Sequence, residues 1–234
     1  MWLKIFYRKN NNTVLINEFK LINKKMESLP EEKNDINTGK ELLEEKKLNC
    51  TWTFWYASRK EKDHNIPYEQ RLKEVFSFST LNEFFNGFMF IKDVESIPRH
   101  NEIAVFKKGY KPLWENTPES AFWFYRFHPE DEKFINIKWE QLIFSLIGEQ
   151  FDEPNILGVV LSKRGRETII ELWFNYFGFN KIKSKLENKF RNLIGLEYED
   201  ALFFKENKKS CMDKSSLRNA ETYGHKKRRK FTFN

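Results

Sequence analysis

The stretch Ile156-Leu-Gly-Val-Val-Leu-Ser-Lys-Arg-Gly-Arg-Glu-Thr-Ile-Ile-Glu-Leu-Trp-Phe174 has an apolar run at each end and a basic centre. Apolar runs of this length that are rich in β-branched residues are typical of strands. Gly165 lies between the runs and supplies the turn that lets the second run fold back beside the first. The stretch therefore predicts an antiparallel hairpin with a basic tip.

Helical patterns precede and follow this hairpin. Apolar residues before it recur at the spacing of one helix face, namely Trp139, Leu142, Ile143, Leu146 and Ile147, and Gly148 follows as a stop. After it, a second helix is expected from Ile182, Leu186, Phe190 and Leu193, ending at Gly195. A third begins at Thr80, where Ser79-Thr80-Leu-Asn-Glu83 forms a capping box, and is expected to reach about Phe90.

Further strands are predicted on both sides of these helices. Aromatic and β-branched residues favour strands at Cys50 to Tyr56, Glu102 to Phe106, Ala121 to Phe127 and Ala201 to Lys205. Strands interrupted by three helices indicate an α+β fold, with helices packed on one face of a curved antiparallel sheet.

Composition suggests one domain with extensions. The chain has 234 residues, of which 40% are hydrophobic, enough for one substantial core. Residues 1–47 are polar and charged and are expected to form a mobile or disordered extension, so a single domain should span 48–234. The basic segment near 206–230 is expected to be flexible. A net charge of +7 favours a polyanionic partner such as nucleic acid.

Several function classes lack their sequence signals. The two cysteines, Cys50 and Cys211, are isolated, which argues against a disulfide framework or a zinc site. No apolar run approaches the length of a membrane span or resembles a signal peptide. No Gly-rich cofactor loop, metal-binding carboxylate pair or nucleophile with its base is visible. We expect a monomeric intracellular protein that is not an enzyme and uses no cofactor or metal.

Trp114 and Glu115 form a candidate purine site. An exposed indole can stack on a base, and a neighbouring carboxylate can accept hydrogen bonds from the N1–H and N2–H₂ groups of guanine. A positively charged methylated guanine would add a cation–π interaction. The simpler interpretation is a core tryptophan followed by a surface glutamate.

The segment Phe106-Lys107-x-Gly109-x-x-Pro112-x-Trp114-Glu115 resembles the cap-binding segment of the eukaryotic translation initiation factor 4E family. Other blocks resemble that family in the same order: Trp52-Thr-Phe-Trp55-Tyr56, Tyr68-Glu-Gln, the helix opening at Thr80, Leu146-Ile-Gly-Glu-x-Phe151, Gly158-Val-Val-x-x-x-Arg164 and Trp173. The resemblance covers about Leu48 to Leu196. It implies a sheet of about eight strands that holds the mRNA cap on its concave side and carries three helices on its convex side.

The resemblance also implies the roles of individual residues. The 7-methylguanine base would lie between Trp114 and Tyr68, with Glu115 on the guanine edge and Trp173 at the methyl group. The cap phosphates would bind Arg164, with Lys163 and Arg166 close by, and Lys208 and Lys209 in the segment that closes over the triphosphate. A strand-edge tyrosine, a buried strand tryptophan and a solvated basic turn are the alternatives.

Some positions depart from the usual pattern of the family. Tyr68 replaces the usual tryptophan, and Ile169 stands where many members carry a phosphate-binding lysine; both features resemble the second class, the 4E-homologous cap-binding proteins. Phe122 stands where a basic residue is usual, so we expect one phosphate contact to be lost. Phosphate contacts position a ligand without reading its base, so affinity should fall more than selectivity.

A protein partner is implied on the convex face. In the family this face binds a helical peptide from a scaffold such as initiation factor 4G or from an inhibitor, and the matching residues are Leu81, Phe85 and Phe144. Phe85 stands in place of a tryptophan and therefore lacks the indole N–H donor. The alternative is that these residues belong to the core.

The function expected from these residues is binding of the 7-methylguanosine cap and recruitment of mRNA to the translation initiation machinery. The expected location is the cytoplasm, with the nucleus as a second compartment. Two alternatives stay open: a cap-occupying translational repressor of the 4E-homologous class, and a protein-interaction module that has lost cap binding.

Overall fold

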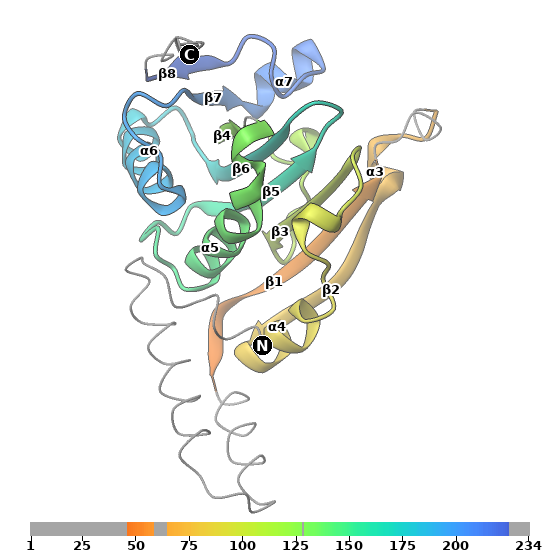
Figure 1. Ribbon diagram of the computed structural model, residues 1–234. Coiled ribbons are helices and arrows are strands. Elements are labelled where there is room, and N and C mark those ends of the chain that lie inside the picture. The colour runs from red at the N-terminus through yellow and green to blue at the C-terminus, as the bar shows by residue number, and fades with distance from the viewer. Residues whose placement is uncertain (1–45, 59–64, 128, 225–234) are drawn as a thin grey trace, which may run out of the picture.

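The computed structural model describes residues 46–58, 65–127 and 129–224, which form one sheet covered by helices (Figure 1). Eight strands lie in the order β2-β1-β3-β5-β6-β4-β7-β8, and every pair of neighbours is antiparallel. The strands are β1 (Lys47–Ser58), β2 (Leu72–Thr80), β3 (Asn101–Lys107), β4 (Ser120–Phe127), β5 (Ile156–Lys163), β6 (Thr168–Asn175), β7 (Leu202–Glu206) and β8 (Glu221–Tyr223). The predicted hairpin is β5 and β6, at the centre of the sheet.

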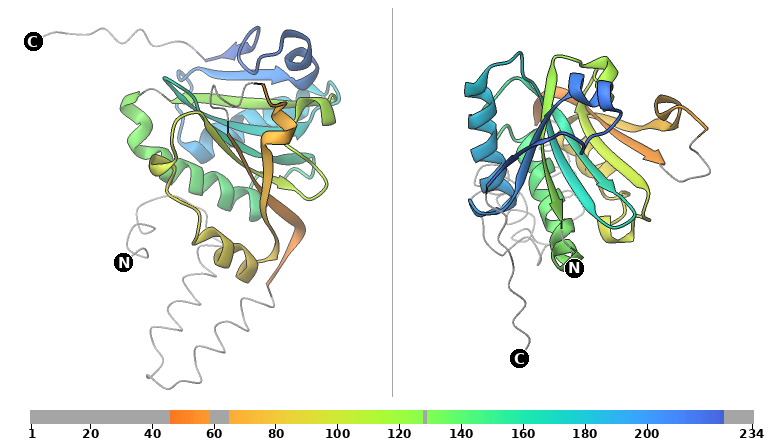
Figure 2. Two further views of the ribbon diagram at one scale, coloured as in Figure 1. Left: turned by 90° about the vertical axis from the view of Figure 1, so that its right-hand side faces the viewer. Right: turned by 90° about the horizontal axis from the view of Figure 1, so that it is seen from above.

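Three long helices pack on one face of this sheet, as Figure 2 also shows. They are α4 (Leu81–Phe88), α5 (Ile135–Ile147) and α6 (Asn180–Ile194). The shorter elements are α3 (Tyr68–Arg71), α7 (Asn207–Asp213) and the 3-10 turns η3 (Val94–Ser96), η4 (Trp114–Asn116) and η5 (Pro129–Phe134). The α+β fold and the curved antiparallel sheet are therefore confirmed.

Strand alternation divides the apolar residues between two cores. On β6, Ile170 and Leu172 point into the larger core beneath the helices, whereas Ile169 and Trp173 point to the opposite face. Successive side chains of a strand point to opposite faces, so one strand can supply both cores. The second core forms the floor on which the candidate site is built.

The predicted start of α4 is confirmed. Thr80 Oγ1 accepts a hydrogen bond from the Glu83 backbone N–H at 3.2 Å, and the Glu83 carboxylate accepts one from the Thr80 N–H at 3.2 Å. The helix ends at Phe88, two residues before the predicted end. This capping box fixes the direction in which α4 leaves β2.

Strand β2 is absent from the expected elements. It lies at an edge of the sheet and its side chains are mostly exposed or half-buried, so it carries little of the apolar pattern that marks an inner strand. The expected extension spans 1–47, and its residues 1–45 lie outside the described part of the chain. Strand β1 starts at Lys47. Of the basic segment near 206–230, residues 206–224 are described and contain α7 and β8.

The predicted partner residues lie on α4 and α5. Leu81 is buried, whereas Phe85 and Phe144 are half-buried and pack against the core, with ring centroids 6.2 Å apart. Just beyond α4, Met89 and Phe90 are largely exposed. Leu81 thus matches the core alternative, and the two phenylalanines lie at the edge of the surface.

Two negative findings concern the described residues alone. None of their helices is long and apolar enough to cross a membrane. Within the same residues, no group of three or more His, Cys, Asp or Glu side chains is arranged to hold a metal ion.

Candidate functional site

A cavity of about 300 Å³ lies on the face of the sheet opposite the long helices. Its wall includes Trp114, Glu115, Tyr68, Trp173 and Arg164, which come from four separate segments of the chain. The sequence analysis assigned a ligand-binding role to all five of these side chains. The fold brings the four residues predicted to bind the base and one arginine predicted to bind phosphate to the same cavity.

The loop after β3 presents Trp114 and Glu115. Gly109 has φ +94°, a conformation that side chains rarely adopt, and it lets the chain turn after Lys107. The 3-10 turn η4 then leaves the Trp114 indole half-buried against the second core and the Glu115 carboxylate exposed. A half-buried indole beside an exposed carboxylate offers a stacking surface and a hydrogen-bond acceptor to a ligand.

Asn207 on α7 anchors this loop, and the sequence analysis missed it. Its buried side-chain amide donates hydrogen bonds to the backbone oxygen and Oγ1 of Thr117, both at 2.9 Å. Thr117 Oγ1 in turn donates to the Leu113 carbonyl at 3.3 Å. The contact joins residues 90 positions apart, so no local sequence pattern predicts it.

Tyr68 is held in place by a hydrogen bond to Glu102. The hydroxyl donates to the Glu102 carboxylate, which comes from β3 and also lines the cavity. The guanidinium of Arg71 lies over the Tyr68 ring, 5.6 Å from its centroid. One face of the ring is therefore covered, and a ligand can stack only on the other.

Trp173 is packed on several sides, and only a small part of its side chain is exposed to the cavity. The side chain is 2% exposed. The Phe122 ring stacks on it at 5.3 Å, Phe106 meets it edge-on at 5.5 Å, and its Nε1–H donates to the Glu171 carboxylate at 2.8 Å. Phe122, at the position where the sequence analysis noted that a basic residue is usual, thus covers one face of the indole.

The two neighbouring cations Lys163 and Arg164 point to opposite faces of the sheet. Arg164 lines the cavity, and its guanidinium donates to Ser216 Oγ. Lys163 lies on the helix side, where its Nζ donates to the carbonyls of Val94 at 2.9 Å and Glu95 at 3.2 Å. Burial lowers the pKa of this ammonium, and the structure does not bring it to the cavity.

The other three predicted phosphate residues also lie away from the cavity wall. Arg166 is exposed at the tip of the hairpin, and Lys208 is exposed on α7. Lys209 pairs with Glu206 at 2.9 Å and Glu221 at 3.3 Å, and its hydrogen bond to Glu206 raises its pKa. Among the five predicted residues, all of them described, Arg164 alone lines the cavity.

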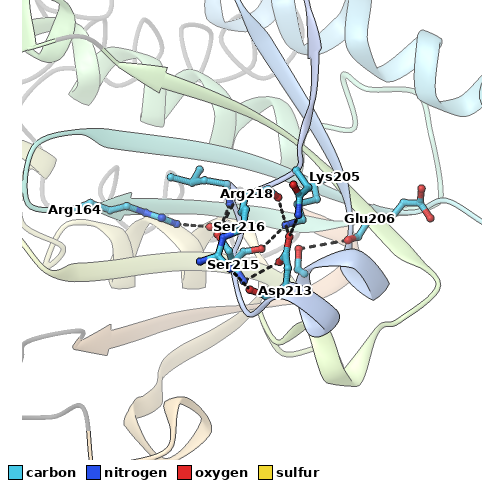
Figure 3. Close-up of polar contacts among 10 residues, drawn as sticks. Arg164, Lys205, Glu206, Asp213, Ser215, Ser216 and Arg218 are labelled. Atoms are coloured by element: carbon cyan, nitrogen blue, oxygen red, sulfur yellow. Dashed lines mark hydrogen bonds and ion pairs between the residues drawn. The ribbon is translucent and has the colours of Figure 1, made fainter.

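A buried lysine holds the loop that reaches Arg164 (Figure 3). The Lys205 ammonium donates to the Asp213 carboxylate at 2.6 Å, to the Ser215 carbonyl at 2.7 Å and to the Arg218 carbonyl. The hydrogen bond from Lys205 lowers the pKa of Asp213. These contacts fix the loop after α7, so that Ser216 lies beside Arg164 on the cavity wall.

Comparisons with known proteins identify the family of the chain. The family model described as eukaryotic initiation factor 4E matches residues 47–222. The chain is 29% identical to eukaryotic translation initiation factor NCBP of Arabidopsis thaliana over 176 residues, which is 74% of this chain and 78% of that protein. It is also 29% identical to eukaryotic translation initiation factor isoform 4E-2 of Zea mays, covering 73% of this chain and 78% of that protein.

Solved structures share the fold. The C. elegans eIF4E-3 complex with the 4E-binding protein Mextli and a cap analogue matches with a TM-score of 0.66 and 23% identity, covering 71% of this chain and 95% of that one. The Ascaris suum eIF4E-3 complex with the m2,2,7G cap matches with a TM-score of 0.64 and 20% identity, covering 69% and 91%. With the family model matching most of the chain, this protein belongs to the eukaryotic initiation factor 4E family.

Proposed function

We propose that this protein binds the 7-methylguanosine cap of mRNA and recruits the mRNA to the translation initiation machinery. The observation that carries the proposal is the convergence of Tyr68, Trp114, Glu115, Trp173 and Arg164 on one cavity. Each of these side chains has a complementary group on a capped nucleotide.

The base would be held by stacking on aromatic rings and by hydrogen bonds to its N1–H and N2–H₂ edge. The Trp114 indole and the free face of Tyr68 provide aromatic surface, which contributes roughly 1–3 kcal/mol per stacked base. The Glu115 carboxylate accepts from the N1–H and N2–H₂ of guanine, a pair of donors that adenine lacks. The positive charge of 7-methylguanine strengthens its attraction to an indole face, which favours the methylated base.

The named relatives support the same function. Two of them carry the name translation initiation factor, and the solved structures of similar fold contain a cap or a cap analogue. The protein acts in this proposal as a binding module in the cytoplasm and performs no chemistry on the RNA.

A protein partner is proposed on the helix side of the sheet. Phe85 and Phe144 lie at the surface edge of α4 and α5, and the exposed Met89 and Phe90 extend this apolar area. A helical peptide from an initiation factor 4G-like scaffold or a 4E-binding protein would cover it. One of the similar structures is a complex with a 4E-binding protein.

Retention on immobilised 7-methyl-GTP tests the cap-binding part. The wild-type protein should be retained and then eluted by free 7-methyl-GTP, and Trp114→Ala should pass through with an unchanged circular dichroism spectrum. Trp114→Phe keeps an aromatic face and should be retained more weakly. Equal retention of Trp114→Ala and wild type would contradict the proposed role of this ring.

Recruitment is tested separately from binding. Addition of the protein to a cap-dependent translation extract depleted of its own cap-binding factor should restore translation of capped mRNA. Inhibition in an undepleted extract without any restoration would instead support a cap-occupying repressor.

A further inference from the structure

The helix side of the sheet carries an apolar surface where α4 and α5 lie side by side (Figure 2). The rings of Phe85, Phe88 and Phe144 are half-buried, and the Phe144 centroid lies 6.2 Å from each of the other two. Met89 and Phe90 follow directly after α4 and are 73% and 84% exposed. We call these five residues the α4–α5 patch. Exposed apolar side chains that gather in one place often mark a contact surface.

The chain enters the sheet beside this patch (Figure 1). The backbone N–H of Leu81, the first residue of α4, donates to the Lys46 carbonyl at 3.0 Å. Lys47, the first residue of β1, pairs with Thr80. Whatever precedes Lys46 therefore starts at the N-terminal end of α4. The eight residues of α4 span only about 12 Å, so the exposed end of the patch is close to this entry point.

The sequence before Lys46 contains an apolar stripe of the matching kind. Residues 1–45 lie outside the described part of the chain, so the stripe is read from the sequence alone. Its members recur at alternating spacings of four and three residues, and they are Leu15, Phe19, Ile22, Met26 and Leu29. This spacing places all five on one face of a helix, and Pro30 directly after them is a stop signal. We call residues 14–29 the stripe segment.

The stripe segment needs a surface to bind. The composition of residues 1–47 is too polar for a core of their own, which is why the sequence predicts disorder there. A polar segment with one apolar stripe forms its helix when the stripe is buried in an apolar groove. The α4–α5 patch offers apolar surface of this kind next to the point where the segment joins the domain.

We propose that the stripe segment docks on the α4–α5 patch of its own molecule as an amphipathic helix. The segment would then occupy the surface on which the proposed scaffold or 4E-binding protein acts, so that such a partner has to displace it. This competition rests on the function proposed above. The docking itself depends neither on the cap nor on a partner.

The tether makes a weak contact sufficient. Residues 30–45 join the stripe segment to β1, and a coil of this length has an end-to-end distance of about 20 Å. A tether of this kind gives the segment an effective concentration of about 1 mM at a nearby surface. With a Kd of about 0.1 mM for the separate segment, the docked state would be about ten times as populated as the free state.

Hydrogen exchange of the full-length protein tests the docking. In the wild type, we expect the amides of the stripe segment to exchange about tenfold more slowly than in Phe90→Asp, because a charge on the patch opposes burial of the stripe. Phe90 is 84% exposed, so its substitution should leave the fold intact. The control is Phe177→Asp, the same change at a side chain that is 54% exposed in the loop between β6 and α6. It should keep the protection.

A second pair of variants tests the contact from the other side. Phe19→Asp combined with Ile22→Asp places two charges on the stripe and should remove the protection of the segment. Asn17→Asp combined with Ser28→Asp adds the same charge to the opposite face of the predicted helix and should keep it.

Three results would overturn the proposal. Exchange of the wild-type segment at the rate of an unprotected chain would show that the segment is not docked. Equal protection in the wild type and in Phe90→Asp would mean that it binds a different surface. Protection that disappears on dilution would mean that a second copy of the chain supplies the segment.

The docking and the cap-binding function fail in different ways. A wild-type protein that shows the protection and does not bind 7-methyl-GTP would contradict the proposed function and leave the docking in place. A protein that binds 7-methyl-GTP and shows no protection would do the reverse.

Discussion

Polar contacts help to hold several side chains of the candidate site in place. The Tyr68 hydroxyl bonds to Glu102, the Trp173 indole to Glu171 and the Arg164 guanidinium to Ser216. Each contact fixes a group that a capped nucleotide would meet. Removing the polar atom while keeping the ring therefore separates orientation from stacking.

Tyr68 offers that separation directly. We expect Tyr68→Phe to weaken 7-methyl-GTP binding about two- to fivefold, since the ring stays and the contact with Glu102 is lost. Tyr68→Ala should weaken it at least tenfold because a stacking face disappears. Calorimetric titration of both variants checks this, and equal losses in the two would show that the ring does not stack on the ligand.

Glu140 gives a prediction about stability. Burial, reinforced by the Asp93 carboxylate, raises the pKa of Glu140 from 4.5 to about 7. The folded protein keeps this proton at pH values where the unfolded chain has lost it, so this group lowers the free energy of unfolding as pH rises from about 4.5 to about 7. Above that range its destabilising contribution is fully present.

Glu140→Gln should remove this pH dependence. We expect the variant to be more stable than the wild type by about 1 kcal/mol at pH 8, a figure reduced for partial screening by solvent, and equal to it at pH 4. Urea unfolding at the two pH values measures the difference. The same difference at both values would mean that Glu140 does not titrate in this range.

The elements around the cavity depend on contacts between segments that are far apart in sequence. The 3-10 turn η4 carries Trp114, and α7 holds that turn through Asn207. The loop after α7 is held in turn by Lys205 of β7. The C-terminal elements therefore form part of the site, although the sequence analysis expected a flexible segment there.

Asn207 should link stability to ligand binding. Asn207→Ala leaves the buried oxygens of Thr117 without their amide donor, which should cost about 1–3 kcal/mol of stability. We also expect weaker 7-methyl-GTP binding, because η4 loses its anchor. Thermal unfolding and titration test both effects, with the exposed Asn192→Ala on α6 as a control that should change neither.

If Asn207→Ala lost stability and bound 7-methyl-GTP as tightly as the wild type, the anchor would be structural only. Other contacts of the loop would then be sufficient to keep η4 in position for the ligand.

How far the sequence predicts this molecule depends on whether a signal is local. The β5–β6 hairpin and the α5 helix follow from apolar spacing within each segment, and both are confirmed. The opposite directions of Lys163 and Arg164 could also have been predicted. Lys163 pairs with Thr168, which alternates out of phase with Trp173, so it must face away from the cavity.

Other features have no local signal. The contact of Asn207 with Thr117 and the burial of Lys205 arise only when the chain is folded. The edge strand β2 lacks a continuous apolar pattern because much of it faces solvent. The sequence thus predicts the aromatic members of the candidate site together with Glu115 and Arg164. Three further carboxylates of the cavity wall, from Glu69, Glu102 and Glu171, and the contacts that hold the site in place require the structure.

The whole molecule combines a basic chain with an acidic cavity. Helices and their core cover one face of the sheet, and the ligand cavity lies on the other. The proposed protein partner and the proposed cap would therefore bind opposite faces, which allows both to be bound at once. Recruitment of capped mRNA by a scaffold needs this arrangement.

The central claim is that the cavity recognises a methylated guanine. Quenching of the intrinsic tryptophan fluorescence by 7-methyl-GTP and by GTP, at one stated salt concentration, tests it most directly. We predict saturable quenching with 7-methyl-GTP bound at least tenfold tighter than GTP, a preference of about 1.4 kcal/mol or more. Equal affinity for the two nucleotides, or no saturable quenching by either, would contradict it.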